Sequence, residues 1–310
     1  MPVPAGEPEI RALNREEPRG KGKTSSLMSA QKQVNAARHK AFSPRKAKLG
    51  QNFLIDASAA RRIVDALGDI HQSTVIEIGP GRGVLTKLLA ERAEQLAAIE
   101  FDSMLAQQLR VAFANSKNVE IVEADFLNVT LEELLRSSGN QRANVVGNIP
   151  YYITSDILLR LFEQHKAIET IVVMVQKEVA DRLAAEPGTR DYGLLTVTAN
   201  LFADVERLFT LPPGAFSPPP EVYSSVLRFR ISPKASDLQI HADEFLEFCR
   251  LSFAQKRKTF FNNVRGRYEA GRIRRAMQEA TVRADARAEM LGLQELAAIY
   301  RALNDDRESR

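Results

Sequence analysis

Residues 147–152 read Gly-Asn-Ile-Pro-Tyr-Tyr and contain groups that together could hold a planar amine. The side-chain oxygen of Asn148 and the carbonyl oxygen of Ile149 can each accept a hydrogen bond from an exocyclic NH2 group. Pro150 fixes the backbone of the turn, and the ring of Tyr151 can stack on a flat base. This order of residue types favours an amine-binding site. The structural alternative is a polar turn with Tyr151 packed on the core.

A glycine-rich turn follows the predicted strand at residues 74–78 and leads into a predicted helix. Its glycines, Gly79, Gly81 and Gly83, let a ligand approach the backbone closely. A dinucleotide-binding turn carries its third glycine five positions after the first, whereas here the distance is four positions. Glu77 would also repel a pyrophosphate, so the turn is better suited to an amine-bearing or cationic ligand.

Acidic residues follow the next two predicted strands. The first of these ends in Glu100, twenty-one residues after Gly79, where an acid typically accepts hydrogen bonds from ribose hydroxyls. The second leads to Asp125 and Phe126, an acceptor and a ring suited to the amine and the face of adenine. Open α/β sheets bind ligands at the carboxyl ends of their strands. These residues and Asn148 therefore predict one site.

Two further stretches could contribute to this site. Residues 50–54 place Asn52 and Leu54 just before a helix predicted over 57–67, and a helix start suits a carboxylate or ribose. A proline-rich loop could present Phe216 as a second stacking ring, because prolines stiffen loops. The structural alternatives are a loop tucked against the core and a buried phenylalanine.

Basic charge is unevenly distributed along the 310 residues, although the net charge is only +4. Residues 1–48 carry eleven Lys and Arg against four acids, and residues 250–275 carry nine against one. This distribution favours a polyanionic partner such as RNA. The segment with Lys256, Arg257 and Lys258, followed by two phenylalanines, is predicted to contact RNA, with a solvated surface as the alternative.

Several classes of function are disfavoured by composition. Cys249 is the single cysteine, which excludes a disulfide framework and a cysteine-based metal site. The four histidines are scattered without a paired ligand spacing, so neither a metal site nor a histidine base is predicted. The longest apolar run, residues 171–175, is far too short to span a bilayer. We expect a cytoplasmic protein.

Three regions are predicted along the chain. Residues 1–43 read as a disordered basic arm, residues 44–232 as the catalytic domain, and residues 233–310 as a small helical RNA-binding domain. Within the catalytic domain, residues 194–202 and 223–231 are predicted strands that form the hairpin closing the sheet.

With these residues in place, the chain resembles the ribosomal RNA adenine N6,N6-dimethyltransferases of the small-subunit type, which are class I methyltransferases. The resemblance runs from about residue 46 to the C-terminal helices. Its most specific segments are residues 50–54, 148–152, 216–224 and 255–259. It implies a Rossmann-like, mostly parallel seven-stranded sheet with helices on both faces, and a small C-terminal all-helical domain.

The resemblance also implies a methyl donor, S-adenosylmethionine, and no metal. The donor-binding positions of the family fall on Asn52, Leu54, Gly79, Glu100, Asp125 and Asn148. The implied target is a pair of adjacent adenosines in a hairpin near the 3′ end of 16S ribosomal RNA, each methylated twice during ribosome biogenesis. We expect the enzyme to act as a monomer on the small ribosomal subunit.

In the predicted mechanism, Asn148 and the Ile149 carbonyl accept the amine hydrogens while Tyr151 and Phe216 sandwich the base. No strong base is required, because the proton leaves after the nitrogen has become cationic. A 23S ribosomal RNA methyltransferase of the resistance type and a non-catalytic assembly factor remain alternatives. The glycine spacing and Glu77 disfavour a nicotinamide-dependent oxidoreductase.

Overall fold

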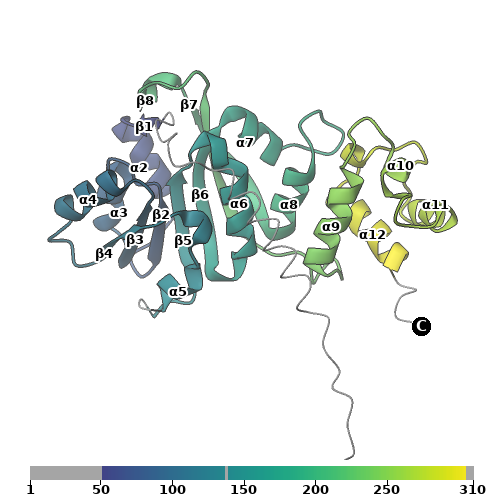
Figure 1. Cartoon of the computed structure of the whole chain (residues 1–310), viewed down its shortest axis with the longest axis horizontal. Coiled ribbons are helices and arrows are strands. Elements are labelled where there is room, and N and C mark those ends of the chain that lie inside the picture. Colours follow the sequence, from purple (N-terminus) through teal and green to yellow (C-terminus); the bar gives the residue numbers. More distant parts are fainter. Residues whose placement is uncertain (1–50, 137–138, 305–310) are drawn as a thin grey trace, which may run out of the picture. The chain divides into compact units, whose positions relative to one another are not determined.

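The computed structural model describes residues 51–136 and 139–304, which belong to one compact unit built on a seven-stranded sheet (Figure 1). The strands of this sheet are β2 (Thr74–Ile78), β3 (Gln95–Glu100), β4 (Val119–Glu123), β5 (Ala143–Asn148), β6 (Ile168–Gln176), β7 (Ala203–Leu211) and β9 (Ser224–Ile231). Their order is β4-β3-β2-β5-β6-β9-β7. The strands β2 to β6 are mutually parallel, and β9 runs antiparallel to both of its neighbours.

Helices cover both faces of the sheet. The α-helices of the described residues are α2 (Ala57–Asp65), α3 (Val84–Ala90), α4 (Ser103–Ala112), α5 (Leu131–Leu135), α6 (Thr154–Glu163), α7 (Lys177–Leu183), α8 (Leu194–Phe202), α9 (Ala242–Ser252), α10 (Phe260–Val264), α11 (Ala270–Glu279) and α12 (Leu293–Asn304), of which α9 to α12 form the C-terminal region. Successive side chains of a strand point to opposite faces. Val75 and Val146 pack with α2 and α3, whereas Ile76 and Val145 pack in the cluster that contains α5, α6 and α8. The predicted mostly parallel sheet with helices on both faces is confirmed.

The prediction of a strand at residues 194–202 is wrong, because this segment is α8 and the strand paired with β9 is β7. Its Thr, Val and Phe residues favour strands when the segment is considered alone. In the helix, the Thr198 hydroxyl donates to the Leu194 carbonyl at 2.8 Å, so this threonine is satisfied locally. A helix buried on most sides lacks the periodicity that distinguishes it from a strand. The second predicted strand, at 223–231, is confirmed as β9.

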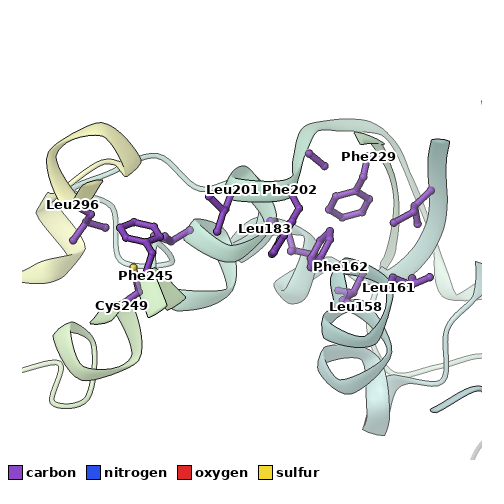
Figure 2. Close-up of a cluster of buried hydrophobic side chains, with 14 of the residues drawn as sticks. Leu158, Leu161, Phe162, Leu183, Leu201, Phe202, Phe229, Phe245, Cys249 and Leu296 are labelled. Atoms are coloured by element: carbon purple, nitrogen blue, oxygen red, sulfur yellow. The ribbon is translucent and has the colours of Figure 1, made fainter. Parts of the chain in front are cut away.

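The C-terminal region is helical, as predicted, and shares a core with the sheet. One hydrophobic cluster contains Phe162 and Phe229 beside the sheet and also Phe245 and Leu296 of α9 and α12 (Figure 2). Cys249 is buried within this cluster, and burial holds the pKa of its thiol well above the ordinary value. The predicted domain boundary at residue 232 remains a prediction.

The predicted arm at residues 1–43 lies outside the described residues. Within the described ranges, no helix is long and apolar enough to cross a membrane.

Candidate active site

The parallel register brings the predicted site residues to one edge of the sheet. The strand β2 lies between β3 and β5 and is paired with both along its whole length. Gly79, Glu100 and Asn148 therefore stand at the carboxyl ends of three adjacent strands, and Asp125 follows β4 next to them. This edge is where open α/β sheets bind ligands.

The side chain of Asn148 is oriented by a residue far away in the sequence. Its Nδ2 donates to the carbonyl oxygen of Asn52 at 2.9 Å. A backbone carbonyl can only accept, so this contact fixes which end of the amide carries the NH2 group and leaves Oδ1 as an acceptor on the other side. Asn52 directly precedes β1 (Phe53–Leu54), which pairs antiparallel with β8 (Phe216–Ser217). The structure thus connects residues 50–54 to the proline-rich loop that contains Phe216.

The glycine turn requires glycine at all three of its glycine positions. Gly79, Gly81 and Gly83 have φ angles of +65°, +57° and +79°, a region that side chains strongly disfavour. A Cβ atom at Gly81 would lie only 3.0 Å from Cδ1 of Phe53. The Gly81 N–H donates to Oε2 of Glu100 at 3.0 Å, which links the turn to the end of β3.

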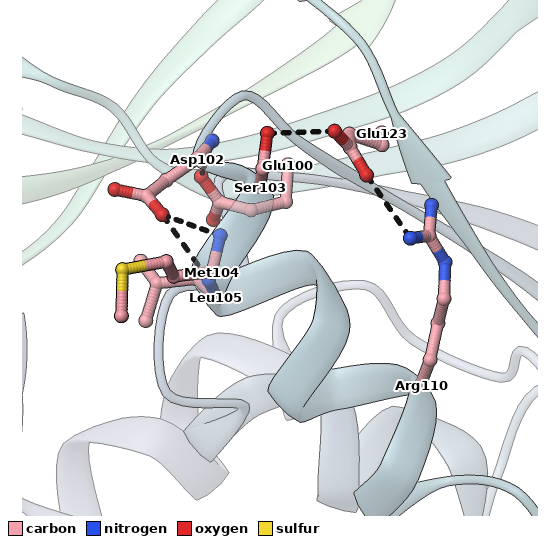
Figure 3. Close-up of polar contacts among 7 residues, drawn as sticks. All are labelled: Glu100, Asp102, Ser103, Met104, Leu105, Arg110 and Glu123. Carbon is pink, nitrogen blue, oxygen red and sulfur yellow. Dashed lines mark hydrogen bonds and ion pairs between the residues drawn. The ribbon is translucent and has the colours of Figure 1, made fainter.

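The acids at the strand ends organise the backbone around the site. Glu100 also accepts from the Asp102 N–H at 2.9 Å, and Asp102 in turn caps α4 through the N–H groups of Met104 and Leu105 (Figure 3). Burial is the main cause of the raised pKa of Glu100. Asp125 caps the following 3-10 turn by accepting from the Leu127 N–H at 3.0 Å. Both acids therefore lie at the carboxyl edge of the sheet with their side chains bonded to neighbouring backbone N–H groups.

Glu77 is the most perturbed acid of the site. Its side chain is 1% exposed, and burial, reinforced by the nearby charge of Glu100, raises its pKa from 4.5 to about 8, while Thr86 acts in the opposite direction. The Glu77 Oε2 and Thr86 Oγ1 atoms are both buried without a hydrogen-bond partner of normal geometry among the described residues. Glu77 also lines a narrow cleft with Gly79, Gly81 and Asn148.

The turn after β5 holds Tyr151 at the rim of the core. Ile149 is buried, and its N–H donates to the Met174 carbonyl at 3.1 Å. The hydroxyl groups of Tyr151 and Ser224 lie 2.6 Å apart, and the tyrosine ring is half-buried. Pro150 has a φ of −58°, as its ring requires. This arrangement fixes the ring of Tyr151 without covering it completely.

Two rings predicted to contact ligands are buried, and two rings that the sequence analysis did not assign are exposed. Phe216 is 2% exposed and Phe126 is 5% exposed, so both belong to the hydrophobic core. Phe101, directly after Glu100, is 64% exposed, and Tyr152 is 50% exposed. The sequence offered one signal for Phe101, which is a large apolar residue directly after Glu100, the acid that ends a strand. Stacking by Phe216 remains a prediction that requires its ring to be uncovered.

A second cleft of about 840 Å³, called the basic cleft because five basic and three acidic residues line it, contains Lys256 and Lys258. The Lys256 Nζ donates to the Arg190 carbonyl oxygen at 2.8 Å. This hydrogen bond connects the loop between α7 and α8 to the loop between α9 and α10. Arg257 is exposed but does not line this cleft. The cleft is also lined by three arginines that the sequence did not single out: Arg182, Arg190 and Arg250.

Residues 43–305 match the model of the family described as ribosomal RNA adenine dimethylase. The chain belongs to this family. The ribosomal RNA small subunit methyltransferase A of Koribacter versatilis is 52% identical over 269 residues, which cover 84% of this chain and 94% of that protein. The protein of the same name from Acidobacterium capsulatum is 56% identical over 261 residues, with coverage of 84% and 92%.

Two solved structures share this fold. The 23S rRNA methyltransferase ErmE superposes with a TM-score of 0.64 at 28% identity, covering 82% of this chain and 100% of that chain. A dimethyladenosine transferase from Plasmodium falciparum gives a TM-score of 0.68 at 22% identity, covering 82% and 98%. The predicted class I methyltransferase fold is therefore confirmed. Among residues 51–136 and 139–304, no three His, Cys, Asp or Glu side chains are grouped so as to hold a metal ion.

Proposed function

We propose that the chain transfers methyl groups from S-adenosylmethionine to N6 of two adjacent adenosines near the 3′ end of 16S ribosomal RNA, giving N6,N6-dimethyladenosine during small-subunit biogenesis. The observation that carries this proposal is the Asn148 amide, which the Asn52 carbonyl orients beside the glycine turn. Membership of the ribosomal RNA adenine dimethylase family and the names of the relatives from two bacteria support the reaction and its target.

The residues present at the strand ends fit the donor. Gly79 and Gly81 leave the backbone open to close approach, and Glu77 offers a buried carboxyl oxygen without a partner among the described residues. When bound, S-adenosylmethionine supplies a methyl group activated by its sulfonium. The residues proposed to hold it are Asn52, Leu54, Glu77, Gly79, Gly81, Glu100, Asp125, Phe126 and Asn148. The exposed ring of Phe101 is a better candidate than Phe126 for the face of the adenine.

The side chains after β5 orient the target amine. Asn148 Oδ1 and the Ile149 carbonyl accept its two hydrogens, which draws the nitrogen lone pair out of the ring system and directs it to the methyl group. Stacking on Tyr151 contributes roughly 1–3 kcal/mol. The proton is lost once the nitrogen carries positive charge, so this scheme needs no histidine. A base can reach this edge only when it has left its stack.

The basic cleft provides the second contact with RNA. Lys256, Arg257 and Lys258 are exposed, and Arg190 and Arg250 lie on the walls of the cleft. Phosphate contacts position a nucleic acid without reading its sequence. We assign this cleft to the RNA backbone outside the target hairpin loop.

A 23S ribosomal RNA target is the second candidate, because the 23S rRNA methyltransferase ErmE superposes on 82% of this chain at 28% identity. Purified protein should be incubated with labelled S-adenosylmethionine and with small subunits that lack the modification, and the digested RNA analysed by mass spectrometry. N6,N6-dimethyladenosine at two adjacent sites near the 3′ end is the expected result. Transfer to 23S RNA alone would support the second candidate, and donor binding without transfer to either RNA would support a non-catalytic assembly factor.

A further inference from the structure

Arg82 stands at the mouth of the cleft lined by Glu77, Gly79 and Asn148. Its guanidinium carbon lies 4.5 Å from the centre of the Phe53 ring, and both residues line the cleft. Arg82 is otherwise exposed. An arginine over an aromatic face is held in place while its N–H groups remain available to a ligand.

The ring of Phe53 is a fixed platform for this arginine. Phe53 pairs with Ser217 between β1 and β8. The ring also packs against the glycine turn so closely that a Cβ atom at Gly81 would lie 3.0 Å from its Cδ1. Arg82 therefore has a defined position at the edge of the site, even though its side chain is exposed.

The charges around Arg82 favour an anionic ligand group. Arg82 makes no ion pair with any acidic side chain of residues 51–136 and 139–304. Glu100 is engaged by the N–H groups of Gly81 and Asp102. Glu77, deeper in the cleft, is buried. The cleft thus combines a buried carboxyl group with a cation at its mouth, which complements a ligand that carries both an ammonium and a carboxylate.

Resting on the proposed function, we propose that Arg82 pairs with the carboxylate of the amino-acid end of S-adenosylmethionine, with Phe53 holding the guanidinium in place and Glu77 facing the ammonium. The planar guanidinium can donate two parallel hydrogen bonds to a carboxylate. Arg82 would thereby distinguish the intact donor from analogues that lack the carboxylate.

The test compares two ligands by calorimetric titration of the full chain: S-adenosylmethionine and decarboxylated S-adenosylmethionine, which keeps the sulfonium and the ammonium. We expect Arg82→Ala to weaken binding of the intact donor about tenfold or more and to leave binding of the decarboxylated analogue unchanged. Arg82→Lys should recover part of the lost affinity, because lysine keeps the positive charge but lacks the paired N–H donors of the guanidinium. Lys87→Ala, which removes one exposed charge from the next helix, is the matched control and should bind both ligands normally.

Equal weakening of both ligands by Arg82→Ala would overturn the proposal, since it would indicate a role in the shape of the cleft. Unchanged binding of the intact donor would overturn it as well. If the unmutated chain binds neither ligand, the proposed function fails together with this inference. Thermal melting of each variant confirms that the binding data refer to folded protein.

Discussion

At the scale of single residues, the proposed site contains one amide whose direction is set by the chain itself. The Asn52 carbonyl accepts from Nδ2 of Asn148, so Oδ1 is positioned before any substrate arrives. An acceptor placed in advance costs no reorganisation during the reaction, which is the property that makes polar groups effective in catalysis.

Replacement of Asn148 by alanine should lower the methylation rate at least about a hundredfold while donor binding is partly retained. The amine then loses one of its two acceptors and its orientation. Single-turnover methylation and donor titration measure the two effects separately. Asn262→Ala, at an exposed position on α10, serves as the control, and an unchanged rate for Asn148→Ala would contradict the assigned role.

Glu77 makes the stability of the protein depend on pH. Its pKa is about 8 in the folded chain and 4.5 in its ordinary state, so the folded state holds the proton more tightly. The stabilisation from the protonated carboxyl is complete below pH 4.5 and is lost as the pH rises toward 8. Over this window the loss approaches about 1.4 kcal/mol per pH unit.

Glu77→Gln should therefore raise the melting temperature at pH 8 and flatten its decline between pH 5 and pH 8. It should also weaken donor binding, because an ammonium group beside Glu77 favours ionisation of the carboxyl, whereas an amide cannot ionise. Calorimetric melting across this range measures the first effect. The expectation fails if the variant and the original chain lose stability in parallel as the pH rises.

At the scale of elements, the close pairing of β2 and β5 determines where Asn148 lies. A Cβ atom at Gly147 would lie 2.7 Å from the carbonyl oxygen of Ile78. That neighbour is a backbone atom at the last registered position of a parallel pair, so it cannot move without disturbing the register that aligns Gly79 with Asn148.

Gly147→Ala should destabilise the protein by about 1–3 kcal/mol and lower activity more than this loss alone explains, because Asn148 is displaced. Gly214→Ala is the matched control, since a Cβ atom there would meet nothing within 4 Å. Urea unfolding and methylation assays of both variants provide the measurement. Equal stability of the two variants would show that the strands can separate at little cost.

At the scale of the whole molecule, the strand-end site and the basic cleft are carried by one connected core. The cluster that contains Ile78 beside the glycine turn also contains Phe245 and Leu296 of the C-terminal helices. A continuous core gives the two surfaces a common framework, which suits the binding of a folded RNA at two places.

Replacing Lys256, Arg257 and Lys258 together by alanine should weaken binding to small subunits and reduce the slope of log affinity against log salt by up to about one per lost phosphate contact. Filter binding at several salt concentrations measures both quantities. The triple variant at Lys87, Lys117 and Lys166 removes the same charge from exposed positions elsewhere and should change the slope little. Identical slopes for both variants would indicate that Lys256, Arg257 and Lys258 are solvated and make no phosphate contacts.

The sequence alone determined the parallel strands and most of the candidate site residues at their carboxyl ends. Continuous apolar runs followed by glycine, acid or amide residues predict parallel strands and the groups at their carboxyl ends, because parallel strands present those ends on one side. Gly79, Glu100, Asp125 and Asn148 were placed in this way. The local pattern was sufficient because each residue ends its own strand or lies within two positions after it.

The tertiary structure alone decided features that depend on distant parts of the chain. The Asn148 amide is oriented by Asn52, the Glu77 pKa is set by burial, and Phe216 is buried by the core. The segment at 194–202 is a helix that is buried on most sides, so its apolar pattern does not distinguish it from a strand. Burial and contacts between distant segments are properties of the packed chain, so local periodicity does not contain them.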